Sequence, residues 1–184
     1  RFGCGAGHGR QRRRGRGHGW QRQAVGVSIQ GAIETALHAF CGEHITLRAA
    51  GRTDAGVHAT GQVIAFSWDG RLDAEELGRA FDALLPRDIA IRDLRTVEPD
   101  WKPRYAARYR EYRYTVWNGP RSPLIERTAL GVRVPLDTAA MERAGSVFIG
   151  RHDFSSFGAA DRSPVRTVMA VRVRRDGRIV TIDV

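Results

Sequence analysis

From Trp20 onward, segments with helical spacing of hydrophobic residues alternate with short segments of strand character. Ser28, a common capping residue, precedes a run at helical spacing made of Ile29, Ala32, Ile33, Ala36, Leu37 and Phe40. Asp73 and Glu76 have the spacing of a capping pair and open a second predicted helix, whose apolar side comprises Leu77, Ala80, Phe81 and Leu84. Strand character is seen in three short runs, residues 45–50, 62–68 and 89–96.

The second half of the chain begins with an alternating pattern that predicts a half-buried strand within residues 108–118. Asp137 then opens a predicted helix whose apolar side comprises Met141, Ala144, Val147 and Phe148. Residues 150–158 have the composition of a loop.

The C-terminal residues predict a hairpin. Residues 167–174 and 178–184 have strand character and flank Asp176-Gly177, a strong short-range hairpin signal. The last predicted strand reaches Val184 without a turn, a cap or a charged tail, so we expect the chain to be truncated at this end.

Together these elements predict the α+β class, with two similar halves of mainly antiparallel sheet and flanking helices. A linker that carries Pro99 and Pro103 separates the halves. We therefore expect an N-terminal α/β domain over residues 18–103 and an incomplete C-terminal α/β domain over residues 104–184.

Residues 1–17 consist mostly of glycine and arginine, and we expect this segment to be disordered because it has little apolar surface to bury. The alternative is a basic arm that contacts RNA phosphates. The formal net charge of the chain is +10, but residues 1–22 hold seven arginines and no acid. The remainder, with 23 basic and 20 acidic residues, is only mildly basic, so overall charge alone does not indicate nucleic acid.

Several classes of protein do not fit the sequence. No apolar run reaches the roughly 18 to 20 residues of a membrane span, and the N-terminal arginines are not followed by the apolar region of a secretory signal. Cys4 and Cys41 lack metal-site spacing and form at most one bridge, which favours a reducing compartment. We therefore expect a cytoplasmic protein without a membrane association.

The stretch AAGRTDAGVHATGQ, residues 49–62, is the main candidate for chemistry. Its glycines and alanines leave space around one carboxylate, Asp54, and Arg52 is close enough in sequence to pair with it. An ionised acid in an open loop can act as a nucleophile or as a base. The alternative is an ion pair that only braces a turn.

Other polar residues give weaker signals. His58 lies four residues after Asp54, and His152 precedes Asp153, but neither pair has a third metal ligand at suitable spacing. Tyr112 and Tyr114 alternate with arginines on the predicted strand. These tyrosines either stack on RNA bases or form one face of the core.

Several motifs resemble the tRNA pseudouridine synthase A family. GRTDAGVHATGQV looks like the signature loop of that family, and REYRYTVWN looks like its Tyr-x-Tyr strand. HGWQRQ, SIQGAIETAL, HDFSSF and RTV are similar to further motifs in the family's order, so the resemblance runs from about His18 to Val184.

The resemblance implies an isomerase that converts uridine to pseudouridine at positions 38–40 of the tRNA anticodon stem-loop, without a metal or an organic cofactor. It assigns the essential acid to Asp54, stacking on the target uracil to Tyr112, and pairing with the acid to Arg52, which also helps fill the space of the flipped-out base. The resemblance leaves two routes open: Asp54 either attacks the substrate covalently or removes a proton to allow a glycal intermediate.

The sequence departs from the family pattern at both ends. An apolar strand precedes HGWQRQ in the family, and a Phe-Leu…Met-Val-Arg segment follows the strand that resembles IVTIDV; neither pattern is found here. Because the family dimer uses C-terminal parts, a homodimer is only one possibility. The alternative to an active enzyme is a catalytically inactive RNA-binding fragment of one.

Overall fold

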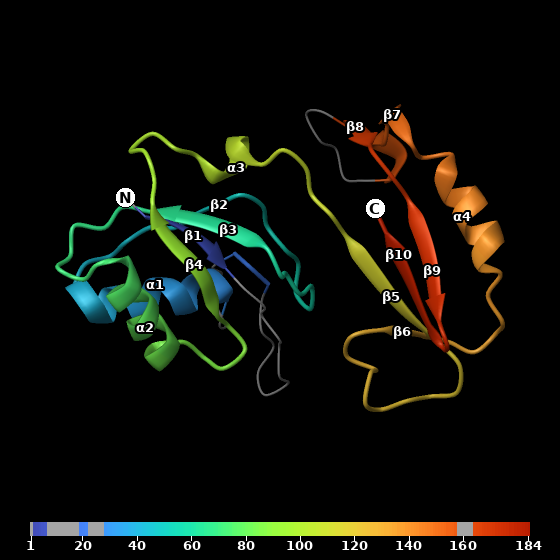
Figure 1. The fold of residues 1–184 in the computed structure, drawn as a ribbon, viewed down its shortest axis with the longest axis horizontal. Coiled ribbons are helices and arrows are strands. Elements are labelled where there is room, and N and C mark those ends of the chain that lie inside the picture. The colour runs from blue at the N-terminus through green and yellow to red at the C-terminus, as the bar shows by residue number, and fades with distance from the viewer. Residues whose placement is uncertain (1, 7–18, 22–27, 158–163) are drawn as a thin grey trace. The chain divides into compact units, whose positions relative to one another are not determined.

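The computed structural model describes residues 2–6, 19–21, 28–157 and 164–184. The chain divides into two compact units, Arg1–Arg108 and Tyr109–Val184, called unit 1 and unit 2 below (Figure 1). Each unit contains a four-stranded sheet and at least one helix, so the fold is mixed α+β with mainly antiparallel pairing. No helix among the described residues combines the length and apolar character needed to cross a bilayer.

The sheet of unit 1 contains β1 (Phe2–Ala6), β2 (Arg48–Ala49), β3 (Gln62–Phe66) and β4 (Ile91–Thr96). Its order is β2-β3-β1-β4 and all neighbours are antiparallel. The central strand β1 lies within residues 1–17, the segment expected to be disordered, so that expectation does not hold for residues 2–6; the rest of the segment lies outside the described residues. Backbone hydrogen bonds to β3 and β4 on both sides give it partners that a composition argument does not consider.

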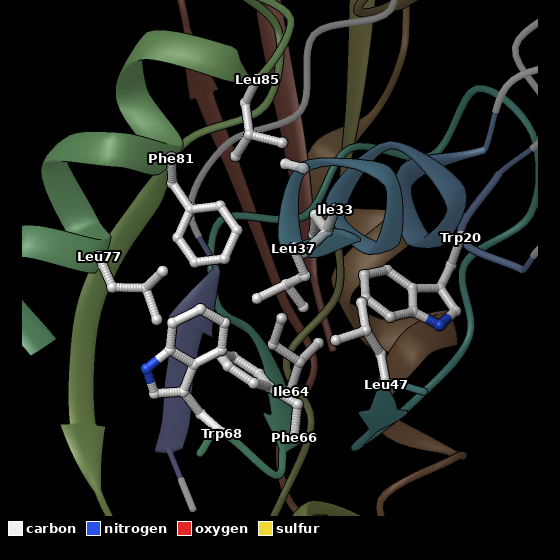
Figure 2. Close-up of a cluster of buried hydrophobic side chains, with 11 residues drawn as sticks. Trp20, Ile33, Leu37, Leu47, Ile64, Phe66, Trp68, Leu77, Phe81 and Leu85 are labelled. Atoms are coloured by element: carbon white, nitrogen blue, oxygen red, sulfur yellow. The ribbon is translucent and has the colours of Figure 1, made fainter. Parts of the chain in front are cut away.

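Two helices of unit 1, α1 (Ile29–Cys41) and α2 (Ala74–Leu84), contribute to its core. The Ser28 side chain accepts a hydrogen bond from the amide of Gly31, and Asp73 and Glu76 form the expected capping box. Both start signals are therefore confirmed. Figure 2 shows the resulting cluster, which includes Trp20, Ile33, Leu37, Leu47, Ile64, Phe66, Trp68, Leu77, Phe81 and Leu85.

A short helix, α3 (Pro103–Ala106), begins at the second proline of the predicted linker. Pro103 occupies its first position, where the missing amide hydrogen is not needed. The boundary between the units follows at Arg108, five residues after the predicted domain boundary.

The sheet of unit 2 contains β5 (Arg113–Asn118), β6 (Leu130–Val132), β9 (Arg172–Asp176) and β10 (Ile179–Asp183) in the order β6-β5-β10-β9. The β5–β6 pair is parallel and the others are antiparallel. The predicted hairpin is confirmed as β9–β10, and Gly177 has a φ angle of 54°, in the left-handed region that glycine permits.

Unit 2 also contains α4 (Thr138–Ser146), a short 3-10 helix (Ser155–Phe157) and a second, two-stranded sheet, β7 (Gly150–Asp153) with β8 (Val165–Val168). The loop expected over residues 150–158 is therefore partly strand. The single strand expected over residues 167–174 is divided between β8 and β9, which belong to different sheets. Periodicity alone missed this break because both parts have strand character.

Candidate active site

The loop that joins β2 to β3 carries Asp54, and it is closed at its base by two hydrogen bonds. The amide of Ala50 donates to the carbonyl oxygen of Val63 at 2.9 Å, which extends the β2–β3 ladder by one step. The Gln62 side chain donates through Nε2 to the carbonyl oxygen of Gly51 at 2.6 Å. The two ends of the loop are thus held together where the sheet ends.

A turn at the tip of the loop exposes Asp54. The amide of Val57 donates to the carbonyl oxygen of Asp54 at 3.2 Å, and Gly56 within this turn has a φ angle of 87°. That left-handed conformation is accessible to glycine without steric cost. Asp54 is exposed in the described structure, so solvent reaches its side chain.

The middle of the loop is held from outside by Trp20, whose amide donates to the carbonyl oxygen of Thr53 at 3.0 Å. The Trp20 side chain is only 3% exposed and belongs to the core cluster in Figure 2. The residue next to Asp54 is therefore tied to the hydrophobic core of unit 1.

Arg52 and Asp54 lie in the same loop, and both are exposed. These two residues, both within the described part of the chain, do not form a salt bridge in this structure. Water screens the attraction between exposed charges, so their closeness in sequence does not by itself impose a pair.

Tyr112 belongs to unit 2, directly before β5. Its amide and carbonyl groups exchange hydrogen bonds with Val184, both at 2.9 Å, and so continue the β5–β10 ladder. The Tyr112 side chain is 51% exposed and that of Tyr114 is 63% exposed, so neither is a core residue of the described structure.

Of the arginines near these tyrosines, Arg113 has a carboxylate partner. Its Nε and Nη2 atoms donate to the two carboxylate oxygens of Asp183, at 2.5 and 3.0 Å. The hydrogen bond from Arg113 lowers the pKa of Asp183, and the same contact raises the pKa of Arg113. Arg113 is therefore already engaged within unit 2, which the alternating sequence did not indicate.

His58 and His152, the two histidines considered as metal ligands, do not belong to a metal-binding cluster within the described part of the chain. No group of three or more His, Cys, Asp or Glu side chains within the described residues is arranged to hold a metal ion. The ring Nε2 of His152 is 3.0 Å from the carbonyl oxygen of Ile149, a local contact within unit 2.

Trp20 and Gln62 support the loop, and the residue-by-residue reading of the sequence did not assign either of them a role. Gln62 is the first residue of β3 and follows the loop directly, and Trp20 lies within the HGWQRQ motif. Both lie within the quoted motifs GRTDAGVHATGQV and HGWQRQ, which was the available signal, but the hydrogen bonds that they make depend on the folded backbone.

Comparison with known proteins supports one family. The family model described as tRNA pseudouridine synthase matches residues 18–106, which include the Asp54 loop. tRNA pseudouridine synthase A of Geobacter sulfurreducens is 44% identical over 169 residues, covering 90% of this chain and 69% of that protein. The Moorella thermoacetica protein of the same name is 45% identical over 173 residues, covering 90% of this chain and 70% of its own length.

A third relative of the same name, from Neisseria meningitidis serogroup C, is 40% identical over 169 residues, covering 89% of this chain and 64% of that protein. The similarity thus extends well beyond the loop and through both units. The chain belongs to the tRNA pseudouridine synthase A family, whose members are isomerases that convert uridine to pseudouridine.

Proposed function

We propose that this chain isomerises uridine to pseudouridine at positions 38–40 of the tRNA anticodon stem-loop, with Asp54 as the essential acid. The single observation that carries the proposal is the exposed Asp54 carboxylate on a loop whose backbone is fixed at its base and beside the acid. A reactive group is most effective when its position is fixed before the substrate arrives.

The reaction moves the base from one ring atom to another without adding or removing atoms overall. The bond between N1 and C1′ breaks, a bond between C5 and C1′ forms, the proton on C5 leaves, and N1 gains a proton. Asp54 either forms a covalent bond with the substrate or removes a proton to allow a glycal intermediate. Both routes require an ionised carboxylate that the nucleotide can reach.

The target uridine is flipped out of the stem-loop, because C1′ and C5 are not both accessible in a stacked strand. In this proposal the Tyr112 ring stacks on the uracil, and Arg52 occupies space that the extruded base leaves. The exposure of Tyr112 supports its role, since a buried ring has no free face for a base. The exposed Arg52 guanidinium has the chemistry for both phosphate contact and stacking.

Release of tritium from tRNA labelled at uracil C5 tests the proposal, because the reaction removes the C5 proton. Asp54→Asn preserves the shape of the side chain and removes its charge. We expect it to lower the rate of release by about 10²–10⁴-fold, the range typical of acid–base groups, while the affinity for tRNA stays nearly unchanged. Asp82→Asn, an exposed position on α2, is the matched control and keeps the parent rate.

Normal turnover by Asp54→Asn would contradict the assignment of the acid. A parent chain that is folded by circular dichroism and binds tRNA but releases no tritium would instead support the RNA-binding alternative.

A further inference from the structure

Gly19 and Trp20 form a bridge between the Asp54 loop and the beginning of α1. On one side the amide of Trp20 donates to the carbonyl oxygen of Thr53 at 3.0 Å. On the other side the amide of Gln30 donates to the carbonyl oxygen of Trp20 at 3.1 Å. The amide of Ile29 donates to the carbonyl oxygen of Gly19 at 3.4 Å. The bridge thus satisfies amides of the first turn of α1, which have no partner within the helix.

The side chain of Trp20 anchors this bridge in the core of unit 1. The Trp20 indole is buried among the residues of the core cluster shown in Figure 2. A buried aromatic side chain has few rotamers and many contacts, so the backbone that carries it has little freedom to shift. The carbonyl of Thr53 is therefore bonded to a rigid donor.

Gly19 approaches the loop more closely than any other residue type would permit. A Cβ atom at this position would meet the carbonyl oxygen of Thr53 and would lie 2.6 Å from the carbonyl carbon of Asp54 and 2.7 Å from its oxygen. Real Cβ atoms essentially never come closer than 3.0 Å to other heavy atoms. All three are backbone atoms, which cannot rotate away as a flexible side chain would.

From this geometry we propose that Gly19 is a positioning residue for the reaction. The absence of a side chain at Gly19 sets how closely the backbone of Asp54 can lie to the core of unit 1, and it thereby sets the position from which the carboxylate acts. This inference rests on the proposed catalytic role of Asp54. It concerns Gly19 itself, which makes no contact with the substrate in this scheme.

The test is Gly19→Ala, examined by hydrogen exchange and by kinetics. We expect faster exchange in peptides covering residues 50–61 and unchanged exchange in peptides covering α2. We also expect kcat for tritium release to fall by about 10²-fold, as for a misplacement of about 1 Å, with little change in KM for tRNA. Gly78→Ala is the matched control, because a Cβ at Gly78 on α2 has no heavy atom within 4 Å; it keeps parent exchange in the loop and parent kinetics.

Parent-like loop exchange and parent-like kcat in Gly19→Ala would overturn the proposal. If that variant fails to fold, exchange of the Trp20 amide in the parent chain decides: protection supports the bridge, and exchange at the rate of a free amide overturns it. Activity in Asp54→Asn would refute the catalytic role of Asp54 and, with it, the link between Gly19 and the reaction. Unchanged loop exchange in Gly19→Ala would refute the positioning of the loop by Gly19 whether or not Asp54 is catalytic, so the two failures are distinguishable.

Discussion

The Tyr112 ring is half exposed, although the backbone of the residue is part of a sheet. That backbone continues the β5–β10 ladder through Val184, whereas the exposed half of the side chain faces solvent. Removing the ring therefore costs the fold little buried surface, while it removes the proposed stacking partner of the uracil.

We predict that Tyr112→Ala lowers the rate of tritium release and weakens tRNA binding, with a thermal midpoint close to that of the parent. Tyr112→Phe keeps the ring and is expected to keep most of the activity. Tyr109→Ala, which removes another exposed tyrosine of unit 2, serves as the control. Unchanged kinetics in Tyr112→Ala would exclude Tyr112 from substrate binding.

At the scale of residues, the sequence indicated a candidate acid but not the contacts that surround it. The glycines and Asp54 were visible as a motif, and the exposure of Asp54 agrees with the expectation of an accessible acid. The sequence did not indicate that the carboxylate partner of Arg113 is Asp183, because the two lie 70 positions apart and meet only through strand pairing. It also did not indicate the contact between Gly19 and the loop.

At the scale of elements, β5 and β10 are joined by a side-chain pair as well as by backbone bonds. Arg113 and Asp183 are directly opposite in the antiparallel register, and the guanidinium makes two hydrogen bonds to the carboxylate. Cross-strand pairs of opposite charge stabilise a sheet, and bidentate geometry is the favourable arrangement.

This pair predicts a pH dependence of stability. Since Arg113 lowers the pKa of Asp183 in the folded state, the folded chain binds the proton less tightly than the unfolded chain. The stabilisation is therefore fully present above the ordinary pKa of about 4 and is lost as pH falls through the lowered value. Asp183→Asn is expected to lower the urea midpoint at pH 7, with a smaller difference from the parent under strongly acidic conditions.

The control for that measurement is the same substitution in an Arg113→Gln background, where the pH-dependent difference should become smaller, because Arg172 and Arg174 lower the pKa of Asp183 less than Arg113 does. A deficit of equal size at all pH values would show that Asp183 stabilises β10 for another reason.

The sequence predicted correctly where the capped helices begin. It predicted less well which side chains are buried near a helix end. Ser28 and Asp73 mark the starts of α1 and α2 as expected. At the end of α2, however, Leu84 is 52% exposed and Leu85 is 8% exposed, because the chain leaves the helix at Leu85 and turns that side chain inward. Helical spacing no longer applies once the backbone becomes extended.

The apolar side predicted for α4 is also only partly correct. No residue of α4 is fully buried, and Val147 and Phe148, just beyond its end, remain exposed. An amphipathic pattern predicts which side of a helix prefers burial, but burial also requires an element that covers that side.

At the scale of the whole molecule, the two units differ in the size of their cores. All but two of the buried hydrophobic residues of the described structure lie in unit 1, and the exceptions in unit 2 are Val116 and Val180. Because the burial of apolar surface is the main favourable term in folding, unit 1 should be the more stable unit.

We predict that the units unfold at different urea concentrations. In hydrogen exchange with increasing urea, amides of β5 and β10 should lose protection before those of α1 and β3. Loss of protection at one common midpoint would show that the chain unfolds as a single cooperative unit despite the unequal cores.

The central position of β1 has a consequence for the order in which the chain folds. Phe2 pairs with Phe66 on one side and with Thr96 on the other, so both sets of hydrogen bonds close long loops. Contacts between residues far apart in sequence form slowly. Until β1 inserts, β3 and β4 each present an unpaired edge, and such edges can pair with other chains. The sheet beside the Asp54 loop is thus exposed to intermolecular pairing for as long as this one strand is missing from its centre.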